Sequence, residues 1–216
     1  MIAILECPAW GQLEVETKRY VSETELQMAA TGEEFMEKMR IEKDDILIRQ
    51  METSDLSLLL KWLTDERVLE WYEGRDACLT MDSLSEHYAE PIPNGGRVII
   101  EYRGQPIGYG QFYRLTDEMF REYEYPDQGQ VVYAMDQFIG EPDYWNRGIG
   151  TTFLNMMADY LKENRAVGIL LLDPHKSNPR AIRAYEKAGF RKMRSLPEHE
   201  LFEGRMEDCW LMERRL

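Results

Sequence analysis

A four-residue apolar run, Ile169 to Leu172, constrains the fold of this chain more than any other feature. The run has no polar residue for a solvent-facing side, and it therefore predicts a strand buried in the centre of a sheet. Helical patterns lie on both sides of it, from Gly148 to Leu161 and from Asn178 to Ala188, the second ended by Gly189. Alternation of helix and strand indicates the α/β class.

The rest of the pattern predicts a mixed sheet with several helices. Strands are expected at Ile46 to Met51, Val131 to Ile139, Phe190 to Arg194 and Cys209 to Glu213, with a hairpin formed by Arg97 to Tyr102, a Gly104-Gln105 turn and Ile107 to Tyr113. Helices are expected from Ser54 or Asp55, through Val68 to Tyr72, and from Met81 to Tyr88.

The first 44 residues differ in pattern from the rest of the chain, and we divide it into an N-terminal extension at 1–44 and a main domain at 45–216. Ser22 with Glu25 has the spacing of a helix cap, and apolar residues up to Met39 suit one helical face. Two interpretations stay open. The extension is either an added arm or a translated leader ahead of an internal start at Met36 or Met39.

Charge narrows the choice of partners. The chain of 216 residues has 26 Lys and Arg against 40 Asp and Glu, a formal net charge of −14. Nucleic-acid binding depends on clustered basic residues, so this balance argues against it and favours a cationic small molecule. Cys7, Cys78 and Cys209 lack paired spacing and predict a reducing, cytoplasmic setting. We expect no signal peptide, no membrane partner, and a monomer or homodimer.

A glycine loop is the strongest local motif. Trp145-Asn146-Arg147-Gly148-Ile149-Gly150-Thr151 lies between a predicted strand and a predicted helix. Glycines there let the backbone approach a ligand, and the first amides of the helix point at an anion such as a diphosphate. A plain turn explains the same residues when they are considered alone.

The second helical pattern makes the motif specific. Asn178-Pro179-Arg180-Ala181-Ile182-Arg183-Ala184-Tyr185-Glu186-Lys187-Ala188-Gly189-Phe190, placed after the glycine loop and the buried strand, resembles the Gcn5-related N-acetyltransferase superfamily, which binds acetyl-CoA. The resemblance covers roughly Ile46 to Arg214. It implies a mixed, mostly antiparallel central sheet flanked by helices. One departure is that Trp145 stands where the family commonly has Arg or Gln.

A closer resemblance is to the aminoglycoside 6'-N-acetyltransferases, including the acetyltransferase half of the bifunctional resistance enzyme. It is carried by Lys61 to Tyr72, Ile107 to Gln111, Met135 to Gly140 and Asp173-Pro174-His175. The resemblance implies that acetyl-CoA, as co-substrate, supplies an acetyl group to the 6'-amine of an aminoglycoside by direct attack in a ternary complex. It implies a cationic aminoglycoside as partner and a role in antibiotic resistance.

The same resemblance implies the roles of individual residues. Asp136 is expected to be the base that takes the proton of the acceptor ammonium, and an acid within an otherwise apolar strand indicates that it has such a partner. Tyr185 is expected to protonate the departing thiolate. Acceptor binding is assigned to Trp71, Tyr72, Gln111, Asp136 and Asp173. Cofactor binding is assigned to Gln137, Phe138, Ile139, Arg147, Gly148, Ile149, Gly150, Thr151, Asn178, Ala181, Tyr185 and Lys187, with the backbone amides of Gln137 to Ile139 as oxyanion donors.

The sequence leaves several alternatives open. The same cofactor loop would serve an acetyltransferase for a polyamine or a protein N-terminus, or a non-catalytic acyl-CoA sensor. The acidic and aromatic stretch from Asp117 to Asp127 suits a polycationic sugar, a surface flap or an interface. His87, His175 and His199 lack metal-ligand spacing, so no metal site is expected.

Overall fold

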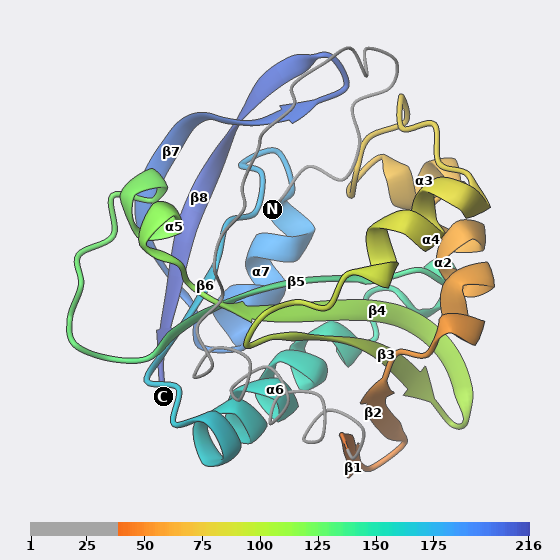
Figure 1. Cartoon of the computed structure of the whole chain (residues 1–216), viewed down its shortest axis with the longest axis horizontal. Helices are drawn as coiled ribbons and strands as arrows, with labels where there is room; N and C mark the ends of the chain where they lie inside the picture. Colours follow the sequence, from red (N-terminus) through yellow and green to blue (C-terminus); the bar gives the residue numbers. More distant parts are fainter. Residues whose placement is uncertain (1–38) are drawn as a thin grey trace, which may run out of the picture.

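The computed structural model describes residues 39–216, and in this part of the chain eight strands form one sheet flanked by helices (Figure 1). The sheet order is β1-β2-β3-β4-β5-β6-β8-β7. The strands are β1 (Arg40–Lys43), β2 (Ile46–Gln50), β3 (Gly96–Tyr102), β4 (Gln105–Arg114), β5 (Val132–Ile139), β6 (Ile169–Leu172), β7 (Arg191–Phe202) and β8 (Arg205–Arg215). The helices are η1 (Thr53–Asp55), α2 (Leu56–Trp62), α3 (Glu66–Leu69), α4 (Met81–Ala89), α5 (Asp117–Glu122), η2 (Pro142–Tyr144), α6 (Ile149–Arg165) and α7 (Pro179–Lys187).

Among the described strands, β5 and β6 are the one parallel pair, and all other neighbours are antiparallel. Their ladder holds only three residue pairs, from Val132 opposite Ile169 to Ala134 opposite Leu171. Beyond Ala134, β5 continues to Ile139 with β4 alone as its partner. The sheet therefore splits between β5 and β6 after a short seam.

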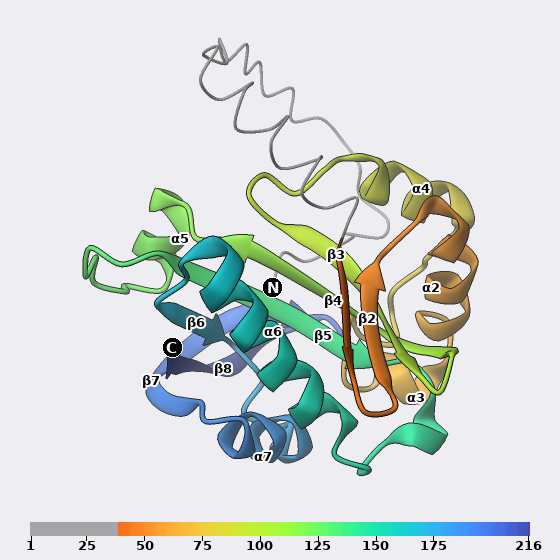
Figure 2. The same cartoon turned by 90° about the horizontal axis from the view of Figure 1, so that it is seen from below.

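Alternating side chains place an apolar core on each face of the sheet. Val98 and Ile100 of β3 pack in the cluster beneath α6, whereas Ile99 packs in the cluster beneath α2 and α4. Figure 2 shows α6 lying across its face of the sheet, with α2 and α4 beyond the sheet's other side. Both faces of the sheet are thus covered.

The strand β6 confirms the interpretation of the apolar run. Leu170 and Leu172 join the cluster beneath α6, and Ile169 and Leu171 join a third cluster under β7, β8 and the α5 segment. All four side chains are at most 3% exposed. The strand lies in the interior of the sheet, between β5 and β8.

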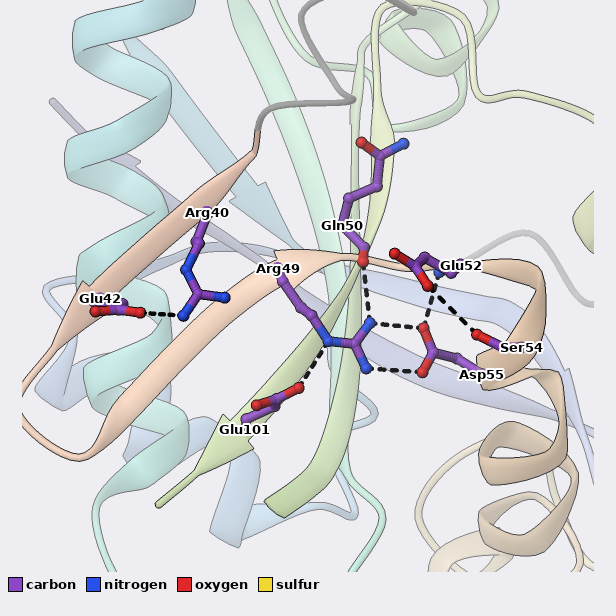
Figure 3. A network of polar contacts seen from close by, with 8 residues as sticks. All are labelled: Arg40, Glu42, Arg49, Gln50, Glu52, Ser54, Asp55 and Glu101. Carbon is purple, nitrogen blue, oxygen red and sulfur yellow. Dashed lines mark hydrogen bonds and ion pairs between the residues drawn. The ribbon is translucent and has the colours of Figure 1, made fainter. Parts of the chain in front are cut away.

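An ion-pair network joins β2 to the first helical turns (Figure 3). The guanidinium of Arg49 donates Nη1 and Nη2 to the two carboxylate oxygens of Asp55, at 2.7 and 2.8 Å, and its Nε donates to Glu101 at 2.7 Å. Asp55 also accepts a hydrogen bond from the backbone N–H of Glu52 at 2.8 Å. The network therefore fixes the path of the chain from the end of β2 into η1 and α2.

Several predicted boundaries were wrong. Trp71 and Tyr72 lie in a turn after α3, because Glu73 and Gly74 adopt positive φ and end the helical segment. The hairpin turn is Arg103-Gly104, both with positive φ, and Gln105 already belongs to β4. The last two strands extend much further than the sequence indicated and form the long β7–β8 hairpin.

Most of the predicted extension, with the helix expected at Ser22 to Met39 and Cys7, lies outside the described residues. Its last residues form β1, which pairs with β2, and Met39 packs in the core. Within residues 39–216, every helix is too short or too polar to traverse a bilayer.

Candidate active site

A cleft of about 380 Å³ opens where β5 and β6 separate. Its walls come from β5, the end of β6, the turn after α3, the loop that leads into α6, and α7. Since the strands are unpaired there, the cleft runs along a free edge of β5. Side chains of β5 alternate between the two faces of the sheet, and so the cleft receives groups from both.

Asp136 lies in the cleft on one face of the sheet. It is 6% exposed, and its register partner on β4 is Gln111. Its Oδ2 accepts hydrogen bonds from Gln111 Nε2 at 2.7 Å and from the Tyr113 hydroxyl at 3.3 Å. Burial raises the pKa of Asp136 above its ordinary value, and the charge of Asp173 acts in the same direction. The Asp136 carboxylate is therefore more basic than an ordinary aspartate.

Asp173 follows β6 directly and lies on the opposite wall of the cleft. It is 6% exposed, and its Oδ2 accepts from the Tyr123 hydroxyl at 2.9 Å and lies 3.2 Å from His199 Nε2. The aromatic residues of the acidic stretch are thus partly inside the protein, because Tyr123 reaches from the end of α5 to this carboxylate. Two buried carboxylates line one cleft.

The other face of the sheet holds a different pair. Gln137 Nε2 donates to the hydroxyl of Tyr185 on α7 at 2.7 Å. Burial raises the pKa of Tyr185, so its hydroxyl keeps its proton at neutral pH. Gln137 Oε1 is buried and has no hydrogen-bond partner among the described residues. This orphaned acceptor, in a residue that lines the cleft, suits a ligand N–H group.

The glycine loop forms the start of α6. Gly148 caps the helix with φ of 80° and offers no side chain to satisfy the first amides. A Cβ added at Gly150 would meet no atom within 4 Å, so the space beside the first turn is open. α6 is 17 residues long, and its positive dipole end faces the cleft. The loop fits an anionic group.

Trp145, which stands where the family commonly has Arg or Gln, contacts the positively charged side chain of Arg180 in the cleft. The guanidinium carbon of Arg180 lies 4.0 Å from the Trp145 ring centre and 5.2 Å from that of Trp71. The Trp145 indole N–H donates to the carbonyl of Ile139 at 2.7 Å. The guanidinium of Arg180 thus makes cation–π contacts with two aromatic rings that line the cleft.

Nearly all residues singled out from the sequence line this one cleft: Trp71, Tyr72, Asp136, Gln137, Phe138, Ile139, Arg147, Gly148, Ile149, Gly150, Thr151, Asp173, Asn178, Ala181, Tyr185 and Lys187. Gln111 does not, because it lies behind Asp136. Asn178 caps α7 by accepting from the backbone N–H of Ala181 at 3.0 Å. Tyr113, Tyr123 and His199 were not individually predicted as site residues, although Tyr123 lies in the acidic and aromatic stretch, since only the fold brings them to the two carboxylates.

His175 also lines the cleft, and it is buried with Glu200 and Cys209. His175 Nε2 lies 2.7 Å from Glu200 Oε2, so these two groups satisfy each other. Burial raises the pKa of the Cys209 thiol, which disfavours a nucleophilic thiolate.

Comparison with known proteins places this geometry in a family. The model for the acetyltransferase (GNAT) domain matches residues 52–197. Aminoglycoside N(6')-acetyltransferase type 1 of Klebsiella pneumoniae is 32% identical over 155 residues, which cover 69% of this chain and 75% of that protein. Spermine/spermidine N(1)-acetyltransferase of Bacillus subtilis is 23% identical over 145 residues, covering 67% and 87%.

Solved structures agree with the sequence relatives. The structure of AAC(6')-Ib in complex with ribostamycin and coenzyme A superposes with a TM-score of 0.65 at 28% identity, covering 80% of this chain and 94% of that one. The mixed sheet flanked by helices agrees with the family match. The chain belongs to the GNAT family of acetyltransferases.

Proposed function

We propose that this protein transfers the acetyl group of acetyl-CoA to the 6'-amine of an aminoglycoside and thereby confers resistance. The observation that carries the proposal is the pair of buried carboxylates, Asp136 and Asp173, in a cleft whose other end is an anion-binding helix start. An aminoglycoside carries several ammonium groups, and buried carboxylates attract and orient them. The similarity to aminoglycoside acetyltransferases in sequence and in structure supports this acceptor.

Asp136 is the proposed base. An acceptor ammonium must lose a proton before its nitrogen can attack the carbonyl carbon of the thioester. Both donors that the described residues offer to Asp136 reach Oδ2, which leaves Oδ1 for the acceptor. The raised pKa of Asp136 brings its basicity closer to neutral pH, where proton transfer is most efficient.

Tyr185 is the proposed acid for the leaving group. When the new N–C bond forms and the C–S bond breaks, the departing sulfur takes a proton from the Tyr185 phenol, and the acylated nitrogen gives its surplus proton back to the phenolate, which leaves a neutral amide and a neutral thiol. Gln137 Nε2 donates to the Tyr185 oxygen, so the hydroxyl hydrogen is free to point elsewhere. Backbone N–H groups point alternately to the two sides of a strand, and on β5 those of Gln137 and Ile139 face the side that has no β6 partner, so these two are the proposed donors to the carbonyl oxygen.

The residues of the cofactor side fit acetyl-CoA. Bound there, acetyl-CoA supplies the activated acetyl group as a thioester. The amides at Gly148, Ile149 and Gly150 would hold the diphosphate, and the orphaned Gln137 Oε1 would accept from an amide of the pantetheine arm. Arg147, Arg180 and Lys187 also line the cleft, and they supply positive charge for the phosphates.

The acceptor side is the face that holds Asp136 and Asp173. Trp71 forms an aromatic wall there, and the Tyr72 hydroxyl is buried without a hydrogen-bond partner among the described residues. A sugar hydroxyl or amine would satisfy that oxygen. We also propose a cytoplasmic setting, which the free thiols of Cys78 and Cys209 support.

A polyamine acetyltransferase is the second candidate. The observation that favours it is the similarity to spermine/spermidine N(1)-acetyltransferase, together with carboxylates that suit any linear polycation.

The test is thiol release from acetyl-CoA with separate acceptors. Kanamycin and tobramycin present a 6'-amine, a 6'-hydroxyl aminoglycoside lacks it, and spermidine represents the polyamines. Turnover with the first two alone supports the proposal. Turnover with spermidine alone would replace it by the second candidate, and silence with all four would contradict both.

A further inference from the structure

Behind Asp136 lies a chain of buried polar groups that does not touch the cleft. The Tyr109 hydroxyl donates to Gln111 Oε1 at 2.9 Å, and Gln111 Nε2 donates to Asp136 Oδ2 at 2.7 Å. Tyr109 is 0% exposed and Gln111 is 6% exposed. Tyr109 and Gln111 are two residues apart on β4, so both side chains project from the same face of the sheet as Asp136.

The two hydrogen bonds that link Tyr109, Gln111 and Asp136 have only one consistent set of donors and acceptors. A primary amide has an oxygen that accepts and a nitrogen that donates. If the Gln111 amide were turned by half a rotation, its oxygen would face the carboxylate of Asp136, and its nitrogen would face the Tyr109 oxygen. The Asp136 carboxylate only accepts hydrogen bonds, so it selects the orientation in which Gln111 Nε2 faces it, and the Tyr109 hydroxyl then donates to Gln111 Oε1 and holds the amide in that orientation.

We infer that Tyr109 is a positioning residue for the base: through Gln111 it holds the Asp136 carboxylate with Oδ2 toward the protein and Oδ1 toward the acceptor. The inference rests on the proposed function and assigns Gln111 to the support of the base instead of to direct acceptor binding. A donor to a carboxylate stabilises its charged form, so this chain also opposes part of the effect of burial.

Other titratable groups surround Asp136 and must stay constant in a test. They are Tyr113 on β4, Asp173 after β6, Tyr72 after α3, Tyr88 on α4, Tyr123 after α5 and Tyr185 on α7. The substitution Tyr109→Phe removes one oxygen and leaves all of these in place. Tyr133→Phe is the matched control, because Tyr133 is a buried tyrosine of β5 outside this chain.

The experiment is a carboxyl carbon-13 NMR titration of the full chain, with the Asp136 signal assigned by its loss in Asp136→Asn. We expect Tyr109→Phe to raise the midpoint of the Asp136 titration by about one pH unit, because the amide is released and donates less. Tyr133→Phe should leave the midpoint unchanged. The measurement needs no acceptor, so it stands even if aminoglycosides are not substrates.

Kinetics supply the second readout. With an accepted amine, the acid limb of kcat/KM in Tyr109→Phe should move in the same direction, while the KM for acetyl-CoA stays constant. In a Gln111→Met background, Tyr109→Phe should change the acid limb of kcat/KM little further, because the hydrogen bonds between Tyr109 and Asp136 are already lost there. An unchanged Asp136 midpoint in Tyr109→Phe, or independent effects of the two substitutions, would overturn the inference.

Discussion

At the scale of single residues, the proposed base is held in a state that costs stability. Its carboxyl is buried, and the pKa is raised by that burial. The folded protein therefore binds this proton at pH values where the unfolded chain, with an ordinary pKa of 3.8, has already lost it. Stability contributed by the protonated form is present below that value and is lost as the pH rises through the folded pKa.

Asp136→Asn should change activity and stability in opposite directions. Turnover should fall by roughly 10²–10⁴-fold, the usual contribution of a positioned base. The melting temperature should match the wild type near pH 4 and exceed it at pH 8 by about 2–4 °C, if on the order of 1 kcal/mol is regained. Thermal unfolding at both pH values, with the exposed Asp159→Asn as control, checks this. A variant that melts lower at pH 8 would contradict the burial argument.

At the scale of elements, the ion-pair network of Figure 3 offers a direct comparison. Arg49 is 23% exposed and binds Asp55 through both oxygens, whereas Arg40 and Glu42 form an ion pair in which both side chains are 60% exposed. Arg49→Met should lower the free energy of unfolding by about 2 kcal/mol, because a buried carboxylate loses its partner. Arg40→Met should cost less than about 0.5 kcal/mol. Urea unfolding measures both, and equal losses would refute the comparison.

The first turn of α6 gives a prediction that concerns binding alone. Since nothing lies within 4 Å of a Cβ at Gly150, Gly150→Leu should fold as the wild type does. Its side chain would occupy the space assigned to the diphosphate, so the KM for acetyl-CoA should rise about tenfold or more. Thr152→Leu, on the same turn but outside the cleft lining, serves as the control. An unchanged KM in Gly150→Leu would place the diphosphate elsewhere.

Elements also show how far sequence patterns reach. The bounds of β6 were predicted because four apolar residues in a row fit a buried strand, and the Asn178 cap was predicted because its signal is local. The β7 strand was missed after Arg194, because Glu198 has positive φ and the pairing with β8 shifts between Leu196 and Glu200. Contacts such as Tyr123 with Asp173 join residues 50 apart, and no local pattern contains them.

At the scale of the whole molecule, the net charge of −14 acts on the two proposed substrates in opposite senses. A polycationic acceptor is attracted by the net charge, whereas polyanionic acetyl-CoA is repelled by it and attracted locally by Arg147, Arg180 and Lys187, and salt screens all of these effects. Raising the salt from about 20 to about 300 mM should therefore increase the KM of the acceptor and lower or leave unchanged that of acetyl-CoA. Steady-state kinetics with a neutral crowding agent as control tests this. A parallel rise of both KM values would contradict it.

The short ladder between β5 and β6 has a mechanical consequence. Within the described sheet, strands β1 to β5 form one part and strands β6 to β8 form another. Only three residue pairs between β5 and β6 join the two parts. A ligand bound in the cleft beyond Ala134 contacts both parts of the sheet. Ligand binding there would therefore add contacts across a junction that only three residue pairs hold within the described sheet.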